Sequence, residues 1–367
     1  MSKKKKTIFI LVGTRPNFIK VTRFKEVAQG YPGVTVSIIH TGQHYDERMA
    51  DVFFKQFNLQ PDYFLNIKPG SQNKQIAEIL MGLEDLINQI GKPEVLLVPG
   101  DVNSTLAGAL FANKQGIKLG HIEAGLRSFD RSMPEEINRV LTDELSDIYF
   151  VTEPSGLKHL REEKKEDTNI HFVGNTMIDA MMAYEKEIEA SGIIDDLKLN
   201  NYPFVLMTMH RPATVDDKAE FLKLIELIEH VSEKYKVVFP IHPRTIKNAR
   251  EFMLYERLSG NPQLICTEPL DYFAFQKLVK TCAFIITDSG GIQEESTYRR
   301  KPCLTIRPNT ERPVTVDEGS NTLLSFDLKE LKGHIQQIES NTYKKGRIPQ
   351  LWDGKATERI MEVLANS

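Results

Sequence analysis

The protein has 367 residues, 41% of them hydrophobic and 26% charged, which is the composition of a soluble globular protein and the length of two domains of similar size. Its 47 basic and 50 acidic side chains leave a net charge of −3, so no broad electrostatic attraction to nucleic acid or to an anionic membrane is expected. The three cysteines, Cys266, Cys282 and Cys303, are odd in number and lack CxxC spacing. This argues against a disulfide framework and a zinc knuckle, and predicts buried thiols in a reducing compartment.

Short apolar, β-branched runs recur along the chain, each followed by turn-forming residues and then by a helical pattern. Unbroken apolar runs are typical of strands buried on both faces of a parallel sheet. In the first half they cover residues 7–12, 34–39, 95–98, 118–122, 148–151 and 170–173, and in the second half 204–209, 236–240, 264–267, 283–287 and 303–306. The pattern predicts an α/β fold of two doubly wound, Rossmann-like domains facing a central cleft.

The charged stretch near residues 175–200 marks the expected boundary. We expect an N-terminal domain over residues 1–180 with the catalytic carboxylates, and a C-terminal ligand-binding domain over residues 200–353. Residues 354–367 carry apolar side chains at helical spacing, which predicts a closing helix packed back on the N-terminal domain. The apolar run after the Lys3–Lys6 cluster is too short for a signal peptide, and no apolar run is long enough to span a bilayer, so a cytoplasmic protein is expected.

Three carboxylates follow predicted elements of the first half. Asp101 ends a buried strand, Glu123 follows the next strand, and Glu135 comes directly after Pro134 at a helix start. Acids with unequal burial near one cleft can have their pKa values separated, so that one serves as acid and another as base. The alternatives are structural: Asp101 as an N-cap or Asx turn, and Glu135 or Glu136 as a partner of the helix dipole.

The second half carries a strand, a Ser289-Gly290-Gly291 turn and a helix start, a pattern that lets a phosphate approach free N–H groups. Glu295, one turn into that helix, is placed to accept hydrogen bonds from ribose hydroxyls. The alternative is that Ser289 is only an N-cap in a tight turn. Neither the P-loop pattern nor the full dinucleotide fingerprint is present, so a nucleotide diphosphate is indicated and NAD is not.

Four further residues lie just after predicted strands. The loop arginines, Arg15 and Arg312, suit a phosphate or carboxylate partner, although a single such arginine is usually solvated. The histidines, His210 and His242, are candidates for proton transfer, although most loop histidines are neutral hydrogen-bonding residues. No set of ligands has zinc spacing, so we expect no metal.

Together these segments resemble the non-hydrolysing UDP-N-acetylglucosamine 2-epimerase family. The motifs that carry the resemblance are GTRP (13–16), TGQH (41–44), GD (100–101), HIEAGLR (121–127), PEEINR (134–139), GNT (174–176), SGGIQEE (289–295) and TERP (310–313). The resemblance implies a fold of the glycosyltransferase-B type, a UDP-sugar as substrate, no cofactor and a homodimer.

By the same resemblance, the residues divide into three groups. UDP would lie against Ser289, Gly290, Gly291 and Glu295, with Arg15 and Arg312 near the diphosphate. The sugar would face Asp101, Glu123, Glu135, Arg139 and His210. Of these, His210 would stabilise the UDP leaving group. Some relatives bind a second UDP-N-acetylglucosamine as an activator at positions that resemble Gln43, Arg211 and His242. This chain departs from the family in reading HRPATVD at residues 210–216, where many members have His-Arg-Arg-Glu-Asn.

The implied reaction is reversible C2 epimerisation to UDP-N-acetylmannosamine through 2-acetamidoglucal. The changed loop leaves room for a related UDP-diacetamido sugar. The other readings are a hydrolysing epimerase that releases N-acetylmannosamine and UDP, a glycosyltransferase on the same fold, and a silent UDP-sugar sensor. A pure sensor has no use for several acid/base groups.

Overall fold

The structure is a computed structural model that describes residues 6–42 and 54–367. Gln43, which was predicted to belong to an activator site, lies outside these residues. The chain divides into two compact units. Unit 1 consists of Met1–Ala183 and Gln350–Ser367, and unit 2 consists of Tyr184–Pro349.

Unit 1 is built on a seven-stranded sheet whose neighbouring strands are all parallel. Across the sheet the strands are β3 (Tyr63–Phe64), β2 (Val34–His40), β1 (Lys6–Val12), β4 (Val95–Pro99), β5 (Lys118–Ile122), β6 (Ile148–Val151) and β7 (Ile170–Phe172). All five residues of β4 are buried, as expected for a central strand covered on both faces. Its helices are α1 (Arg15–Ile19), α2 (Phe24–Ala28), α4 (Gln72–Ile90), α5 (Asn103–Gln115), α6 (Pro134–Leu145), α7 (Pro154–Glu162), α8 (Thr176–Ala183) and α19 (Ala356–Asn366).

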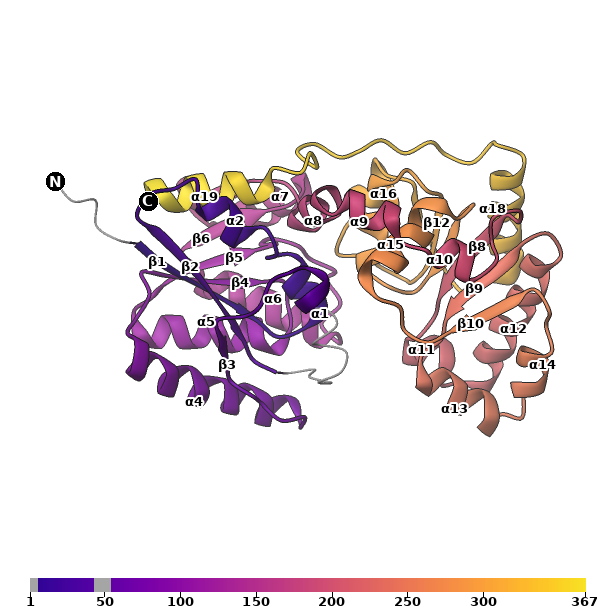
Figure 1. Ribbon diagram of the computed structural model, residues 1–367, viewed down its shortest axis with the longest axis horizontal. Helices are drawn as coiled ribbons and strands as arrows, with labels where there is room; N and C mark the ends of the chain where they lie inside the picture. The colour runs from indigo at the N-terminus through magenta and orange to yellow at the C-terminus, as the bar shows by residue number, and fades with distance from the viewer. Residues whose placement is uncertain (1–5, 43–53) are drawn as a thin grey trace. The chain divides into compact units, whose positions relative to one another are not determined.

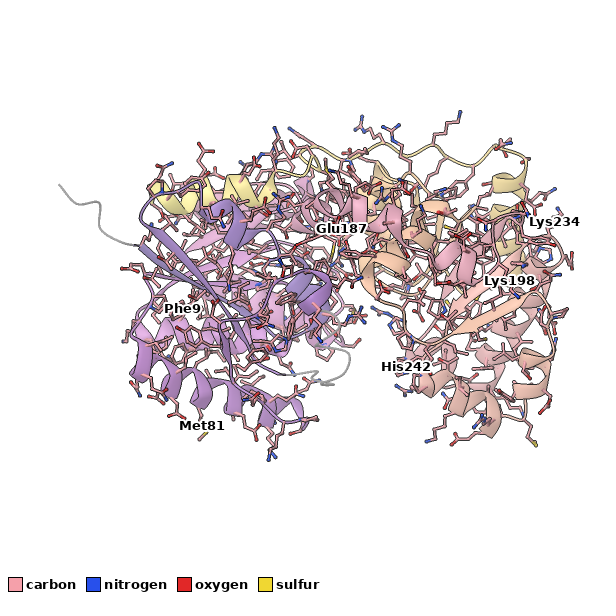
Figure 2. All side chains as sticks on the ribbon, viewed as in Figure 1. Phe9, Met81, Glu187, Lys198, Lys234 and His242 are labelled. Carbon is pink, nitrogen blue, oxygen red and sulfur yellow. The ribbon has the colours of Figure 1, made fainter. Side chains whose placement is uncertain are left out.

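Helices α4 and α5 cover one face of this sheet (Figure 1). On α4 the buried side chains Ile79, Leu83 and Ile87 recur every four residues and pack on Phe9 and other sheet residues. Figure 2 shows Phe9 in the sheet layer and Met81 on the outer side of α4, where 66% of Met81 is exposed. The apolar side of α4 and the buried residues of α5 therefore close one side of the core together.

The C-terminal helix α19 packs on α2 and α8 of unit 1. Asp179 of α8 fixes its start, because the Asp179 carboxylate accepts hydrogen bonds from the backbone N–H groups of Ala356 (3.1 Å) and Thr357 (2.6 Å). Just before it, the indole of Trp352 donates to the Thr152 carbonyl at 3.0 Å. These bonds explain why the end of the chain returns to unit 1.

Unit 2 is built on a six-stranded parallel sheet. Its strands, in order, are β10 (Leu264–Thr267), β9 (Lys236–Pro240), β8 (Phe204–Thr208), β11 (Ile285–Thr287), β12 (Cys303–Ile306) and β13 (Asn321–Leu324). Its helices are α9 (Glu185–Ala190), α10 (Ile193–Asp196), α11 (Pro212–Val215), α12 (Lys218–Ser232), α13 (Pro243–Glu251), α14 (Tyr255–Ser259), α15 (Tyr272–Thr281), α16 (Gly291–Tyr298), α17 (Val314–Asp317) and α18 (Leu328–Glu339).

The predicted class, two doubly wound α/β domains, is confirmed, and the structure adds details that the pattern did not give. Strands β3 and β13 were not predicted, because β3 has two residues and β13 begins with the polar pair Asn321 and Thr322. Residues 184–200, expected to be a boundary, form α9 and α10 of unit 2, where Glu185 pairs with Lys280 and Arg299. The prediction that all three cysteines are buried is wrong for one of them, because Cys266 lies exposed on the edge strand β10.

Gly125, just after β5, is a position where only glycine fits. Its φ is +80°, and a Cβ there would lie 2.4 Å from the carbonyl oxygen of Gly156. We expect Gly125→Ala to lower the free energy of unfolding of unit 1 by about 2–4 kcal/mol, because the clash is with backbone that cannot turn aside. Urea unfolding followed by fluorescence of Trp352, the single tryptophan, which is buried in unit 1, measures the loss.

The matched control is Gly116→Ala. Gly116 also has a positive φ, +63°, but a Cβ there meets no atom within 4 Å. This change should cost only about 1 kcal/mol, the penalty of the backbone conformation alone. Equal costs for the two variants would contradict the close approach of Gly125 to Gly156.

Candidate active site

Each sheet has a point where its strand order reverses, and in doubly wound folds ligands bind beside the carboxyl ends of the strands at that point. In unit 1 the reversal lies between β1 and β4, and in unit 2 between β8 and β11. Arg15 and Asp101 follow β1 and β4, whereas His210 and Ser289 follow β8 and β11. The predicted site residues therefore form two sets, one on each unit.

In unit 1 the central feature is a buried ion pair between Lys20 and Glu123. The Lys20 Nζ lies 2.6 Å from Glu123 Oε2, and both side chains are almost fully buried. Glu123 Oε1 is also buried and has no hydrogen-bond partner in the described part of the chain. The backbone of Glu123 has φ of +74°, a region that L residues other than Asn and Asp rarely adopt. Such strain, together with a buried unpaired carboxylate oxygen, is typical of a functional residue.

Asp101 belongs to a second ion pair in the same unit. Its side chain pairs with Arg139 of α6, whose other guanidinium nitrogen binds Glu136 at 2.6 Å. Helix α5 has Val102 as its N-cap, without a side-chain cap, so Asp101 is not the cap that we considered as its alternative role. A Cβ on Gly100 would lie 3.3 Å from Lys20 Nζ and 3.6 Å from Glu123 Oε2, so the backbone beside Asp101 borders the Lys20–Glu123 pair.

The two glutamates at the start of α6 differ in their surroundings. Glu136 is buried, and its carboxylate accepts hydrogen bonds from the backbone N–H and hydroxyl of Ser128 and from the N–H of Phe129, each at 2.9 Å. Glu135 is exposed and has no hydrogen bond or ion pair with any residue of the described ranges. The structural role that we considered for one of the pair therefore belongs to Glu136, and Glu135 is left available.

A buried network holds the loops that carry Asp101 and Glu123. The His121 ring contacts the Asp143 carboxylate through Nδ1 at 2.6 Å and the Gly100 carbonyl through Nε2 at 2.7 Å. The second Asp143 oxygen accepts the N–H of Gly125 at 3.0 Å and pairs with Arg127. Burial alone would raise the pKa of Asp143, but His121 and Arg127 outweigh it and the pKa lies below its ordinary value. One carboxylate thus fixes both loops.

In unit 2, His210 is held by Asp288 at the reversal point. The Asp288 side chain is fully buried, with Oδ1 2.9 Å from His210 Nδ1, while Oδ2 accepts the backbone N–H groups of His210 and Arg211, each at 2.8 Å. Burial alone would raise the pKa of Asp288, but these interactions with His210 and Arg211 outweigh it and lower the pKa. Half of the His210 side chain is exposed. His210 is therefore oriented by one ring nitrogen and open to a ligand at the other.

The Ser289-Gly290-Gly291 turn leads directly into α16. The N-cap of α16 is Gly290, and no side chain caps the helix, so Ser289 is not the N-cap that we considered. The Ser289 hydroxyl has no hydrogen-bond partner among residues 6–42 and 54–367. A pocket of about 260 Å³ next to it is lined by Thr208, Met209, His210, Pro240, His242, Pro269, Leu270, Phe275, Ser289 and Ile292. Open N–H groups beside an apolar pocket suit an anionic ligand with a flat apolar part.

Arg312 lies in a buried charged cluster beside this turn. It pairs with Glu294 at 3.1 Å and with Glu311. A Cβ on Gly290 would lie 2.9 Å from Glu311 Oε1 and 3.2 Å from Arg312 Nη1. Gly290 is therefore required for the arginine to come this close to the turn.

Four other residues were predicted to belong to the site. His242 caps α13, because its Nδ1 accepts the N–H of Arg244 at 3.2 Å, and it also lines the pocket of unit 2; Figure 2 shows it after β9. Arg211 lies near enough to Arg307 to affect its pKa, and Arg15 begins α1 partly exposed. Gln43 is outside the described residues.

Sequence reasoning missed Lys20 and Asp288. Lys20 comes five residues after Arg15, at the end of the helix that follows β1, and Asp288 directly precedes the Ser-Gly-Gly turn. A charged residue at the end of a buried parallel strand is the signal that could have identified Asp288.

Glu295 gives a pH test of unit 2. Burial, and then the neighbouring Glu294, raise the pKa of Glu295 from 4.5 to about 8. Between these values the folded state keeps a proton that the unfolded chain has released, so the free energy of unfolding falls as pH rises, by up to about 1.4 kcal/mol per pH unit.

The side chain of the Glu295→Gln variant cannot ionise. We therefore expect its free energy of unfolding not to show this fall with rising pH. Without nucleotide, its thermal midpoint should exceed that of the wild type at about pH 8 and approach it at about pH 5, where Glu295 is protonated in the folded state. Thermal unfolding across this range checks the expectation. An equally steep decline in the variant would show that another group causes it.

Neither a metal site nor a membrane span is present in the part of the chain that the structure describes. No group of three His, Cys, Asp or Glu side chains is arranged to hold a metal ion there. No described helix is long and apolar enough to cross a membrane.

Comparisons with known proteins identify the family. The profile of the UDP-N-acetylglucosamine 2-epimerase family matches residues 26–365. A relative from Methanococcus maripaludis with that name is 42% identical over 344 residues, which cover 92% of this chain and 93% of the relative. A Pseudomonas aeruginosa relative, UDP-2,3-diacetamido-2,3-dideoxy-D-glucuronate 2-epimerase, is 34% identical over 98% of this chain and 99% of its own.

A solved structure shows the same relationship in three dimensions. The crystal structure of Methanocaldococcus jannaschii UDP-GlcNAc 2-epimerase in complex with UDP-GlcNAc and UDP is 38% identical, with a TM-score of 0.88 over 98% of this chain and 100% of that chain. With the family profile and the relatives, this shows that the chain belongs to the UDP-N-acetylglucosamine 2-epimerase family of isomerases.

Proposed function

We propose that this enzyme interconverts UDP-N-acetylglucosamine and UDP-N-acetylmannosamine by inversion at C2. The observation that carries the proposal is the pair of carboxylates, Asp101 and Glu123, placed after the neighbouring strands β4 and β5, each held by a buried cation. Inversion needs a group on each face of C2, one to remove a proton and one to return it. Glu135, exposed at the start of α6, supplies a third carboxylate.

The proposed reaction is an elimination followed by an addition. A carboxylate removes the C2 proton, the C2–H electron pair forms the C1–C2 double bond, and the C1–O bond breaks with its electrons leaving on UDP. The phosphate oxygen of UDP then attacks C1 of 2-acetamidoglucal, while a protonated group delivers a proton to C2 from the opposite face. These two steps together conserve atoms and charge and use no oxidant or cofactor.

Unit 2 would bind the nucleotide. The pocket lined by Phe275 and Leu270 suits the uracil ring, and the uncapped start of α16 with the free Ser289 hydroxyl suits a phosphate. Glu295 would bind the ribose. With both ring nitrogens protonated, His210 would donate from Nδ1 to Asp288, which orients the ring, and from Nε2 to the leaving diphosphate. By the family resemblance, Arg15 would contact the phosphates and Arg139 the sugar.

A related substrate is the second candidate. The Pseudomonas relative named as a diacetamido-glucuronate epimerase is 34% identical over almost the whole chain, and the HRPATVD segment departs from the family pattern. The two candidates share the C2 chemistry and differ in the groups at C3 and C6 of the sugar.

Product identification by NMR separates these candidates. The enzyme would be incubated with UDP-N-acetylglucosamine, with the UDP-diacetamido uronic acid, and with UDP-N-acetylglucosamine plus a sugar acceptor. We expect UDP-N-acetylmannosamine without net release of UDP. Net UDP with free N-acetylmannosamine would indicate the hydrolysing reaction, and product only with an acceptor would indicate a glycosyltransferase.

Two further features stay predictions. Activation by a second UDP-N-acetylglucosamine at Gln43, Arg211 and His242 would make the initial rate depend sigmoidally on substrate concentration. A homodimer would give twice the monomer mass by light scattering.

A further inference from the structure

Arg307, just after β12, is a buried cation whose hydrogen bonds are incomplete. Its side chain is 2% exposed, and its Nη2 lies 3.0 Å from Glu311 Oε2. Its Nε and Nη1 are buried, and neither has a hydrogen-bond partner in residues 6–42 and 54–367. Buried guanidinium groups without acceptors are costly and rare, which indicates that an acceptor arrives with a ligand.

The charges around Arg307 point to an anion. Burial lowers the pKa of Arg307, Glu311 raises it, and the nearby Arg211 and Arg312 lower it further. Glu311 pairs with both Arg307 and Arg312, and Glu294 pairs with Arg312. Because Glu311 is shared between two arginines, it leaves Arg307 only partly neutralised, which favours an anion at its unpaired nitrogens.

The free side of Arg307 faces the start of α16. A Cβ placed on Gly290 would lie 3.2 Å from Arg307 Nη1, so the guanidinium borders the Ser289-Gly290 turn. That turn carries the uncapped N–H groups of an eight-residue helix. Two independent sets of donors, one from the backbone and one from Arg307, therefore converge on one spot.

We propose that Arg307 is a diphosphate-binding residue, donating from its unpaired Nε and Nη1 to phosphate oxygens held at the start of α16. The proposal rests on the proposed function in one respect, that the ligand is a UDP-sugar. Arg307 adds a buried fork that is already fixed by Glu311 before the nucleotide binds. A preformed donor loses little entropy on binding, so its contribution to affinity is large.

Calorimetric titration of the full chain with UDP, and NMR titration with uridine, test the proposal. We expect Arg307→Gln to weaken UDP binding by about 100-fold, the loss of two charge-assisted hydrogen bonds in a buried site. Uridine has no phosphate and should bind the variant and the wild type within about three-fold. Arg307→Lys, which keeps the charge but not the fork, should fall between them.

Arg347→Gln is the matched control, because Arg347 is a largely exposed arginine of the same unit that also pairs with one glutamate, Glu318. It should leave UDP affinity unchanged. If Arg307→Gln binds UDP within about three-fold of the wild type, or loses uridine and UDP equally, Arg307 does not recognise the diphosphate and the proposal is wrong. A wild-type protein that does not bind UDP would instead overturn the proposed function itself.

A second readout separates recognition from folding. Without nucleotide, Arg307→Gln should unfold near the wild-type temperature, because Glu311 keeps Arg312 as its partner. With saturating UDP, the rise in midpoint should be smaller in the variant than in the wild type, since ligand stabilisation follows affinity. Equal rises would contradict the proposal.

Discussion

Asp101→Asn is expected to lower kcat for epimerisation by about a thousand-fold while UDP affinity stays within about three-fold of the wild type. The amide has the shape of the carboxylate but cannot accept or return a proton, and loss of such a group costs about 10²–10⁴ in rate. Arg139 keeps Glu136 as a partner in the variant, so the start of α6 stays in place. Steady-state rates by NMR and calorimetric UDP titration measure the two effects separately.

Asp167→Asn is the control for the change of charge. Asp167 belongs to the same unit, pairs with Arg161, and has a side chain that is 70% exposed. We expect it to alter neither quantity. If Asp101→Asn lowered turnover and UDP affinity equally, Asp101 would be a binding or structural residue. That result would support the alternative hypothesis that the protein is a catalytically silent UDP-sugar sensor.

Lys20→Met is expected to lower the free energy of unfolding of unit 1 by about 3–5 kcal/mol. The change removes the buried cation beside Glu123 and leaves a carboxylate with neither water nor a partner, which is the costly way to break a buried pair. Adding Glu123→Gln should restore much of the loss, because a neutral amide tolerates burial better. The two singles and the double variant form a cycle that yields the coupling energy, measured by urea unfolding with Trp352 fluorescence.

Lys25→Met is the matched control. Lys25 pairs with Asp62 at 2.8 Å, but both side chains are about one-third exposed. Solvent screens such a pair, so the change should cost less than about 1 kcal/mol. A double variant that lost the full sum of the two single effects at Lys20 and Glu123 would show that the pair is not coupled.

The strands could be predicted because a parallel sheet covered on both faces leaves unbroken apolar runs in the sequence. Asp101, Glu123, His210 and Ser289 could be predicted for a related reason, since each follows such a run and the carboxyl ends of parallel strands share one edge. The substrate came only from the family resemblance, because no periodicity distinguishes one nucleotide sugar from another.

The partners of these residues could not be predicted. Lys20 and Glu123 are 103 residues apart in the sequence, and His210 and Asp288 are 78 residues apart. Only the fold brings each pair together. Glu135 and Glu136 illustrate the same limit. Both lie at the start of α6, but only the fold brings Ser128 and Arg139 into contact with the Glu136 carboxylate. The sequence alone could not show which of the two glutamates has a structural role.

Deuterium incorporation is the most direct test of the central claim, that this site moves the proton at C2 of the sugar. The wild-type enzyme would be incubated with UDP-N-acetylglucosamine in D2O until the sugars reach equilibrium, and C2 of each would be examined by NMR. We predict deuterium at C2 of both UDP-N-acetylglucosamine and UDP-N-acetylmannosamine, and a much slower exchange in Asp101→Asn. Substrate that keeps hydrogen at C2 after prolonged incubation would contradict the account.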